Sequence, residues 1–238
     1  MNPAHYIEQT NLKPTLDGND IEKLIEEALK YKFMGVCVPP FWVKKVKRDL
    51  LKTDTKVVTV IGFPLGYNRT ETKIREAEIA LKDGADELDL VISMTGFKTN
   101  PFWAKVEIVR LAEIAHQAEK MLKVIIETAY LSQKEIKQTA LICQEAGADF
   151  VKTSTGFASA GFASSELSKN NGFYAGAKLE DVKLIRSTVS EMVGIKASGG
   201  IKTYQQVQDF VKAGAERIGT SSGVEIMEEY FEKLRITN

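Results

Sequence analysis

Two lysines, Lys152 and Lys196, lie in apolar segments where covalent chemistry on a carbonyl group could take place. Lys152 interrupts "FVKTSTGF" (150–157), and Lys196 interrupts "VGIKASGG" (193–200) in the same way. An amine attacks a carbonyl only when neutral, and at a reference pKa of about 10.4 roughly one lysine in a thousand is neutral at pH 7. Burial and a neighbouring cation both lower the pKa of a lysine, so two adjacent lysines favour imine formation. A protonated imine is an electron sink for cleavage of a C–C bond.

An acid on a third segment strengthens this interpretation. Asp89, in "ELDLV" (87–91), could hold Lys196 in its charged form and relay protons through water. A single lysine in a strand is usually a rim residue with its head group in solvent, which is the alternative for each lysine alone. Two lysines at equivalent positions of neighbouring strands, with an acid nearby, favour the catalytic interpretation.

The elements that position these residues alternate along the chain. Three junctions share one pattern, in which a helix ends, glycine, alanine and an acid follow, and a strand begins: "LKDGADELDL", "CQEAGADFVK" and "VKAGAERIGT". Between such junctions, stretches with apolar residues at three- and four-residue spacing predict helices. One of them, 20–32, begins at Asp20 as a predicted cap, with Leu29 on its predicted apolar face.

Eight short apolar runs are predicted strands: 6–12, 35–38, 56–61, 87–92, 122–127, 150–153, 194–197 and 217–219. Strands this apolar are parallel and covered on both faces. We therefore predict an α/β protein, a single (β/α)8 TIM barrel domain over residues 1–238 with a C-terminal helix. A doubly wound open sheet is the alternative, and it is less favoured because the sequence has no dinucleotide fingerprint.

Glycine-rich segments follow the last two predicted strands, "ASGGIKT" (197–203) and "GTSSGV" (219–224). Barrels often bind a substrate phosphate in these two loops, where backbone N–H groups and helix N-termini face the anion. The candidate residues are Gly199, Gly200, Gly219, Ser221 and Ser222. Ordinary turn glycines and serine helix caps are the alternative. The presence of both segments favours phosphate.

Composition excludes several classes of partner. The 32 basic and 32 acidic residues cancel, so no broad positive field exists for nucleic acid or an anionic membrane. No apolar run approaches membrane-spanning length, and the N-terminus lacks an apolar signal region, so we expect a cytoplasmic protein. Cys37 and Cys143 have no metal-ligand spacing. Two histidines leave little room for a histidine metal site or a Ser-His-Asp triad.

The chain resembles the deoxyribose-phosphate aldolase family of class I aldolases. The likeness runs from about Ile7 to Gly223 and is carried by "VIGFPLG", "GADELDLVI", "LKVIIET", "GADFVKTSTGF", "VGIKASGGIKT" and "AGAERIGTSSG", in that order. The resemblance implies reversible cleavage of 2-deoxy-D-ribose 5-phosphate to D-glyceraldehyde 3-phosphate and acetaldehyde, in deoxynucleoside catabolism. It implies no metal ion and no organic cofactor, and it favours a homodimer.

The resemblance also implies roles for individual residues. Lys152 would form the Schiff base, Lys196 would lower the pKa of Lys152, and Asp89 would serve the proton relay. Thr155 leads towards the phosphate side of the pocket. The positions that match the phosphate loops of the family are Gly156, Gly199, Gly200, Ser221 and Ser222.

The chain departs from the family pattern at several positions. Glu8 stands where the family usually has aspartate, and Pro39 and Ser93 stand where asparagine is common. The segment between Ala158 and Gly176 is longer than the family pattern predicts. These departures leave open another class I aldolase or a transaldolase-like enzyme on a different phosphorylated sugar. A non-catalytic barrel that binds a sugar phosphate is less favoured, because both lysines are present.

Overall fold

Eight parallel strands close into one barrel in chain order in the computed structural model, which describes residues 1–159 and 175–237. The strands are β1 (Ile7–Thr10), β2 (Gly35–Val38), β3 (Lys56–Ile61), β4 (Glu87–Val91), β5 (Met121–Ile125), β6 (Phe150–Lys152), β7 (Gly194–Ser198) and β8 (Arg217–Thr220). Each lies within two residues of its predicted bounds. The predicted (β/α)8 TIM barrel is confirmed.

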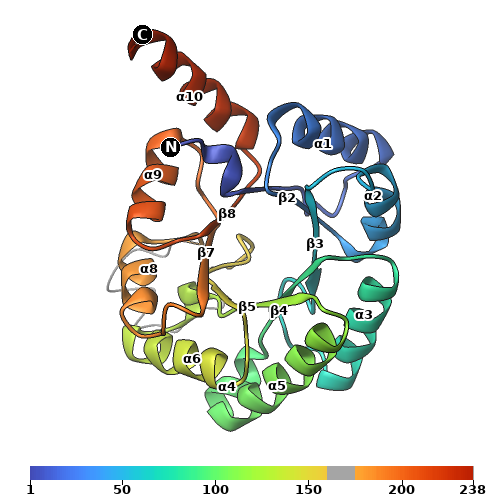
Figure 1. The fold of residues 1–238 in the computed structure, drawn as a ribbon. Coiled ribbons are helices and arrows are strands. Elements are labelled where there is room, and N and C mark those ends of the chain that lie inside the picture. Colours follow the sequence, from blue (N-terminus) through green and yellow to red (C-terminus); the bar gives the residue numbers. More distant parts are fainter. Residues whose placement is uncertain (160–174, 238) are drawn as a thin grey trace.

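Helices form a ring around the strands, and α10 extends away from this ring at the C-terminus (Figure 1). The α-helices are α1 (Gly18–Tyr31), α2 (Val43–Asp49), α3 (Thr70–Lys82), α4 (Met94–Thr99), α5 (Pro101–Gln117), α6 (Gln133–Glu145), α8 (Leu179–Arg186), α9 (Tyr204–Lys212) and α10 (Gly223–Thr237). Short 3-10 helices are η1 (Pro3–His5), η2 (Pro40–Trp42) and η3 (Thr128–Tyr130). Within the described ranges, no helix is long and apolar enough to cross a membrane.

The repeated junctions between helix and strand have a conformational reason. Gly84, Gly147 and Gly214 adopt φ values of 103°, 82° and 108°, in the left-handed region that favours glycine. At the first two junctions the acid two residues later also holds the neighbouring strand, since Asp86 accepts the N–H of Val57 and Asp149 accepts that of Leu122. At these two junctions the local pattern therefore ends the helix and also fixes the start of the adjacent strand.

The first helix corrects two details of the sequence prediction. Its cap is Asp17, whose carboxylate accepts the N–H groups of Asn19 and Asp20. Asp20 is the third helical residue and completes a capping box by accepting the N–H of Asp17. Leu29 is 45% exposed and does not join the apolar face. Most of the segment between Ala158 and Gly176, residues 160–174, lies outside the described residues.

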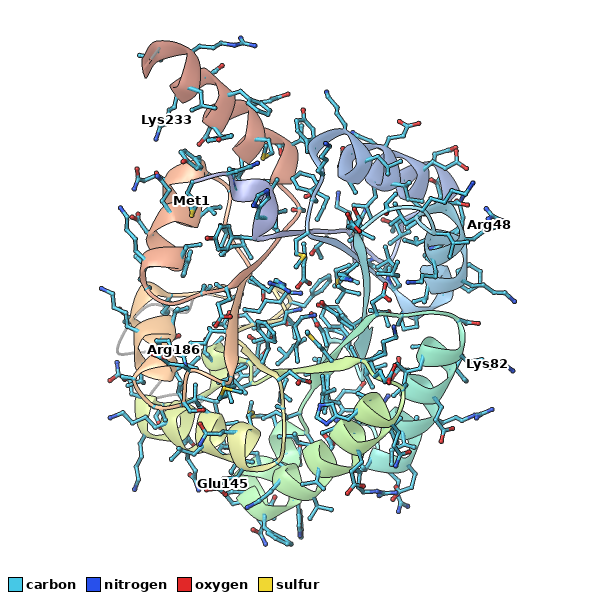
Figure 2. All side chains as sticks on the ribbon, in the orientation of Figure 1. Met1, Arg48, Lys82, Glu145, Arg186 and Lys233 are labelled. Carbon is cyan, nitrogen blue, oxygen red and sulfur yellow. The ribbon has the colours of Figure 1, made fainter. Side chains whose placement is uncertain are left out.

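The barrel separates two kinds of interior. A large apolar core fills the layer between the strands and the helices. The space enclosed by the strands holds a small apolar cluster of Cys37, Val58 and Val60, and beside it a set of buried charged side chains. Side chains fill this enclosed space (Figure 2). A (β/α)8 barrel is a packed core rather than a pore, and here part of that core is ionic.

Gly194 tests this packing. A Cβ at Gly194 would lie 2.3 Å from the ring of its register partner Phe150, whereas one at Gly18 would lie no closer than 3.9 Å to another residue. We therefore expect Gly194→Ala to lower the free energy of unfolding by about 1–3 kcal/mol. Gly18→Ala should change it by less than about 1 kcal/mol. Chemical denaturation of both variants measures the difference, and equal stability would contradict the described packing.

Candidate active site

The two lysines predicted to act together lie side by side on β6 and β7. Lys152 and Lys196 are register partners, so they leave the two strands at the same height. Both Nζ atoms donate to one oxygen, Oδ2 of Asp89 on β4, over 2.8 Å from Lys152 and 2.7 Å from Lys196. The structure brings together the three residues that the sequence assigns to chemistry.

Three further charged side chains extend this contact. Lys123 on β5 donates to Asp89 Oδ1 over 2.9 Å, and its Nζ lies 2.6 Å from Glu87 Oε2. Glu8 on β1 accepts a hydrogen bond from Lys196 and lies 3.5 Å from Lys123. These side chains are at most 4% exposed, and together we name them the buried ion cluster: Glu8, Glu87, Asp89, Lys123, Lys152 and Lys196. Three acids face three lysines, so the formal charges cancel.

Charge pairing outweighs desolvation within this cluster. Burial alone would raise the pKa of Asp89, but Lys123, Lys152 and Lys196 hold that pKa well below its usual range. Burial disfavours a charge on Lys196, yet Asp89 and Glu8 raise its pKa above the usual value. These directions favour a carboxylate at Asp89 and an ammonium at Lys196.

Lys152 is the member of the buried ion cluster that lines a cavity of about 220 Å³ at the carboxyl ends of the strands. Lys196 and Asp89 lie beneath it and are fully buried. A reacting carbonyl in this cavity would contact the Lys152 amine first. Lys196 and Asp89 would influence that reaction through their charges, from beneath the cavity.

The predicted phosphate residues are mostly in the wall of the same cavity. Thr155, Gly156, Gly199, Gly200, Gly219 and Ser221 line it. Ser222 does not, and its backbone N–H donates to Thr220 Oγ1 over 2.9 Å. The hydroxyl of Thr155 donates to Glu127, so its proton is already engaged. A Cβ at Gly199 would lie 2.9 Å from Gly176, and glycine is therefore required for this close approach.

Four residues of this region were not predicted from the sequence. Lys13 and Lys202 line the cavity and bring positive charge to its wall. Lys123 interrupts the apolar run "LKVII", the same signal that identified Lys152. Glu127 follows β5, is 4% exposed and has a pKa raised by burial. No pattern in the sequence distinguishes Glu127 from other acidic residues.

The departures from the family pattern have clear positions. Glu8 belongs to the buried ion cluster and contacts Lys196 directly. Ser93 caps α4 by accepting the N–H of Gly96 over 3.1 Å, and Pro39 immediately precedes the 3-10 helix η2.

Cys37 is fully buried, and burial raises the pKa of its thiol to about 11. Over the described stretches of the chain, no group of three or more His, Cys, Asp or Glu residues is placed to hold a metal ion.

Lys123 gives a test of the buried ion cluster. Replacing Lys123 by methionine leaves the neighbouring carboxylates short of one buried positive charge, and we expect a loss of about 3–5 kcal/mol in the free energy of unfolding. Lys120→Met removes a half-exposed pair with Asp86 and should cost at most about 1 kcal/mol. Denaturant unfolding of the two variants gives the comparison. Similar losses would show that the cluster is not a buried network.

Proteins similar to this chain are named as aldolases. The deoxyribose-phosphate aldolase of Thermococcus kodakarensis is 47% identical over 228 residues, with 94% of this chain and 95% of that protein covered. The one from Clostridium botulinum strain ATCC 19397 is 46% identical, with 95% and 100% covered.

Solved structures show the same relationship. An aldolase called QR15 is 38% identical, covers both chains fully and has a TM-score of 0.88. The deoxyribose phosphate aldolase of Aeropyrum pernix, described as a tetramer, is 31% identical with a TM-score of 0.84, and 97% of this chain and 92% of that chain are covered. The sequence profile of the DeoC/LacD family of aldolases matches residues 4–229. The chain is an aldolase of the DeoC/LacD family.

Proposed function

We propose that this aldolase cleaves 2-deoxy-D-ribose 5-phosphate reversibly to D-glyceraldehyde 3-phosphate and acetaldehyde, in deoxynucleoside catabolism. One observation carries the proposal: Lys152 reaches the cavity while its charged partners are sealed beneath it. The relatives named deoxyribose-phosphate aldolase, at 43–47% identity, support the choice of substrate.

The reaction begins with the neutral amine of Lys152 attacking C1 of the open-chain sugar. Loss of water gives a protonated imine, and removal of the proton from the C3 hydroxyl breaks the C2–C3 bond, with the electron pair entering the imine. Protonation at C2 and hydrolysis release acetaldehyde and return the amine. Asp89, which accepts hydrogen bonds from both Lys152 and Lys196, would relay protons through water.

The phosphate end of the substrate fits the opposite wall of the cavity. Backbone N–H groups near Gly156, Gly199 and Gly200 can approach an anion closely, since no Cβ intervenes. Lys13 and Lys202 add positive charge at the same wall. The catalytic roles are the Schiff base for Lys152, a neighbouring positive charge for Lys196 and the relay for Asp89. No metal ion or organic cofactor takes part in these steps.

The same proposal extends to the domain, the oligomeric state and the compartment of this protein. Residues 1–238 form one catalytic domain, and two copies associate as a homodimer. The enzyme acts in the cytoplasm, which agrees with the two buried, unpaired cysteines. The partner of the site is a sugar phosphate, with neither nucleic acid nor membrane involved.

Borohydride trapping tests the Schiff base. With acetaldehyde present, reduction should attach an ethyl group to Lys152, and peptide mass spectrometry should locate it there. Lys152→Met should abolish both the adduct and turnover. Lys105→Met, which removes a surface pair with Glu145, should keep both. An adduct on another lysine, or none in the unaltered protein, would overturn the assignment.

A panel of aldehydes separates this reaction from its alternative, another class I aldolase or a transaldolase-like enzyme on a different phosphorylated sugar. Glu8 in place of the usual aspartate is the observation that favours the alternative. We expect acetaldehyde as donor and D-glyceraldehyde 3-phosphate as acceptor to give the highest kcat/KM. If ketone donors such as dihydroxyacetone react and acetaldehyde does not, the alternative gains and the first proposal fails.

A further inference from the structure

Glu127 is a buried acid that has no role in the chemistry above. It follows β5 and adopts φ 48° and ψ 72°, a left-handed conformation that costs a non-glycine residue about 1–2 kcal/mol. Two other non-glycine residues in the described ranges, Lys32 and Glu119, have positive φ, and both are exposed near the ends of helices. Glu127 differs because it is buried beside the site, where such strain often accompanies function.

The carboxylate of Glu127 accepts two hydrogen bonds from one residue, Thr155. Its Oε2 accepts the backbone N–H of Thr155 over 3.1 Å and also the hydroxyl of Thr155. Thr155 Oγ1 in turn accepts the N–H of Phe157 over 3.0 Å. The other oxygen, Oε1, is buried without a hydrogen-bond partner in the described structure. A buried carboxylate held in this way fixes the turn from Thr155 to Phe157.

Two more contacts join the same pair of loops. The N–H of Thr128 donates to the carbonyl of Thr153 over 2.9 Å. The N–H of Ser159 donates to the hydroxyl of Tyr130 over 2.8 Å. The turn after β5 therefore holds the segment 153–159 at three points, Thr153, Thr155 and Ser159. That segment directly follows the nucleophile Lys152.

Gly156 is the residue that this arrangement places at the cavity. It adopts φ 80° and lies close to Gly199, since a Cβ at Gly156 would be 3.8 Å from the Cα of Gly199. Both glycines line the cavity wall. Backbone N–H groups bind an anion well only when their positions are fixed before the anion arrives.

We propose that Glu127 is a positioning residue for phosphate recognition, which holds Gly156 against the cavity through Thr155. The inference rests on the proposed function for the identity of the substrate. It differs from a purely structural role, because loss of a fold contact would impair reactions of phosphorylated and unphosphorylated substrates equally. A positioning role affects only the phosphate end.

Steady-state kinetics with 2-deoxyribose 5-phosphate and 2-deoxyribose separate these two roles. Glu127→Ala should raise KM for the phosphorylated sugar at least tenfold and leave kcat/KM for the unphosphorylated sugar within about twofold. Glu145→Ala is the matched control, since Glu145 lies on the outside of α6 (Figure 2) and should leave both values unchanged. An equal fall for both sugars, or no change for either, would overturn the proposal.

A second variant tests the route through Thr155. Thr155→Val removes the hydroxyl that donates to Glu127 and should lower the preference for phosphate to a similar extent. The double variant should then be little worse than either single variant, because both break one connection. Additive losses would show that Glu127 does not act through Thr155. If Glu127→Ala does not fold, Thr155→Val still decides whether this connection sets phosphate preference.

Binding of inorganic phosphate tests the role of Glu127 without any turnover of substrate. Titration calorimetry of the unaltered enzyme, Glu127→Ala and Glu145→Ala should show binding at least tenfold weaker in the Glu127 variant alone. Equal binding in all three would overturn the proposal. Absence of an acetaldehyde adduct in the unaltered enzyme would instead refute the proposed reaction, while the phosphate titration would still decide the role of Glu127.

Discussion

Charge balance inside the barrel is the constraint on which the rest of this structure depends. Taking acidic and basic side chains out of water is costly, and only close pairing of opposite charges offsets that cost. The members of the buried ion cluster come from β1, β4, β5, β6 and β7, so their pairing depends on the register of those strands. A slip of one residue in any of these strands would turn its charged side chain into the apolar helix layer. The ionic interior therefore specifies the barrel as well as the site.

The same balance separates the roles of chemically similar lysines. Lys123 and Lys196 are fully buried among carboxylates, which keep both of them charged. Lys152 shares Asp89 with them but lies at the edge of the cavity, where a substrate and water can reach it. The proposed nucleophile must meet its substrate, and Lys152 lines the described cavity, whereas Lys123 and Lys196 are fully buried. Position in the barrel, rather than residue type, thus distinguishes the proposed nucleophile from its neighbours.

Sequence reasoning reached the fold and the chemical centre because both leave local patterns. Glycine junctions and continuous apolar strands are short-range signals, and a lysine inside such a strand is conspicuous. Lys123 is equally conspicuous in sequence, but it lies near the start of β5 rather than at its carboxyl end, where barrels place catalytic residues. The contact between Glu8 and Lys196 joins β1 and β7, which are not neighbours in the barrel, so no local pattern predicts it. The role of Asp17 as cap, and the hydrogen bonds of Glu127, depend on backbone conformation that residue types alone do not determine.

The glutamate at position 8 gives Lys196 a second carboxylate partner. A glutamate carries one methylene more than the aspartate that the family resemblance leads one to expect. Its register partner on β2 is Gly35, and a Cβ there would lie 3.5 Å from Cγ of Glu8 and 3.0 Å from the carbonyl oxygen of Lys56. The first distance is ordinary van der Waals contact, so the tight approach at Gly35 is to the strand β3 carbonyl and not to the acid. Glu8 reaches Lys196 directly, so this lysine is held by two carboxylates rather than by Asp89 alone.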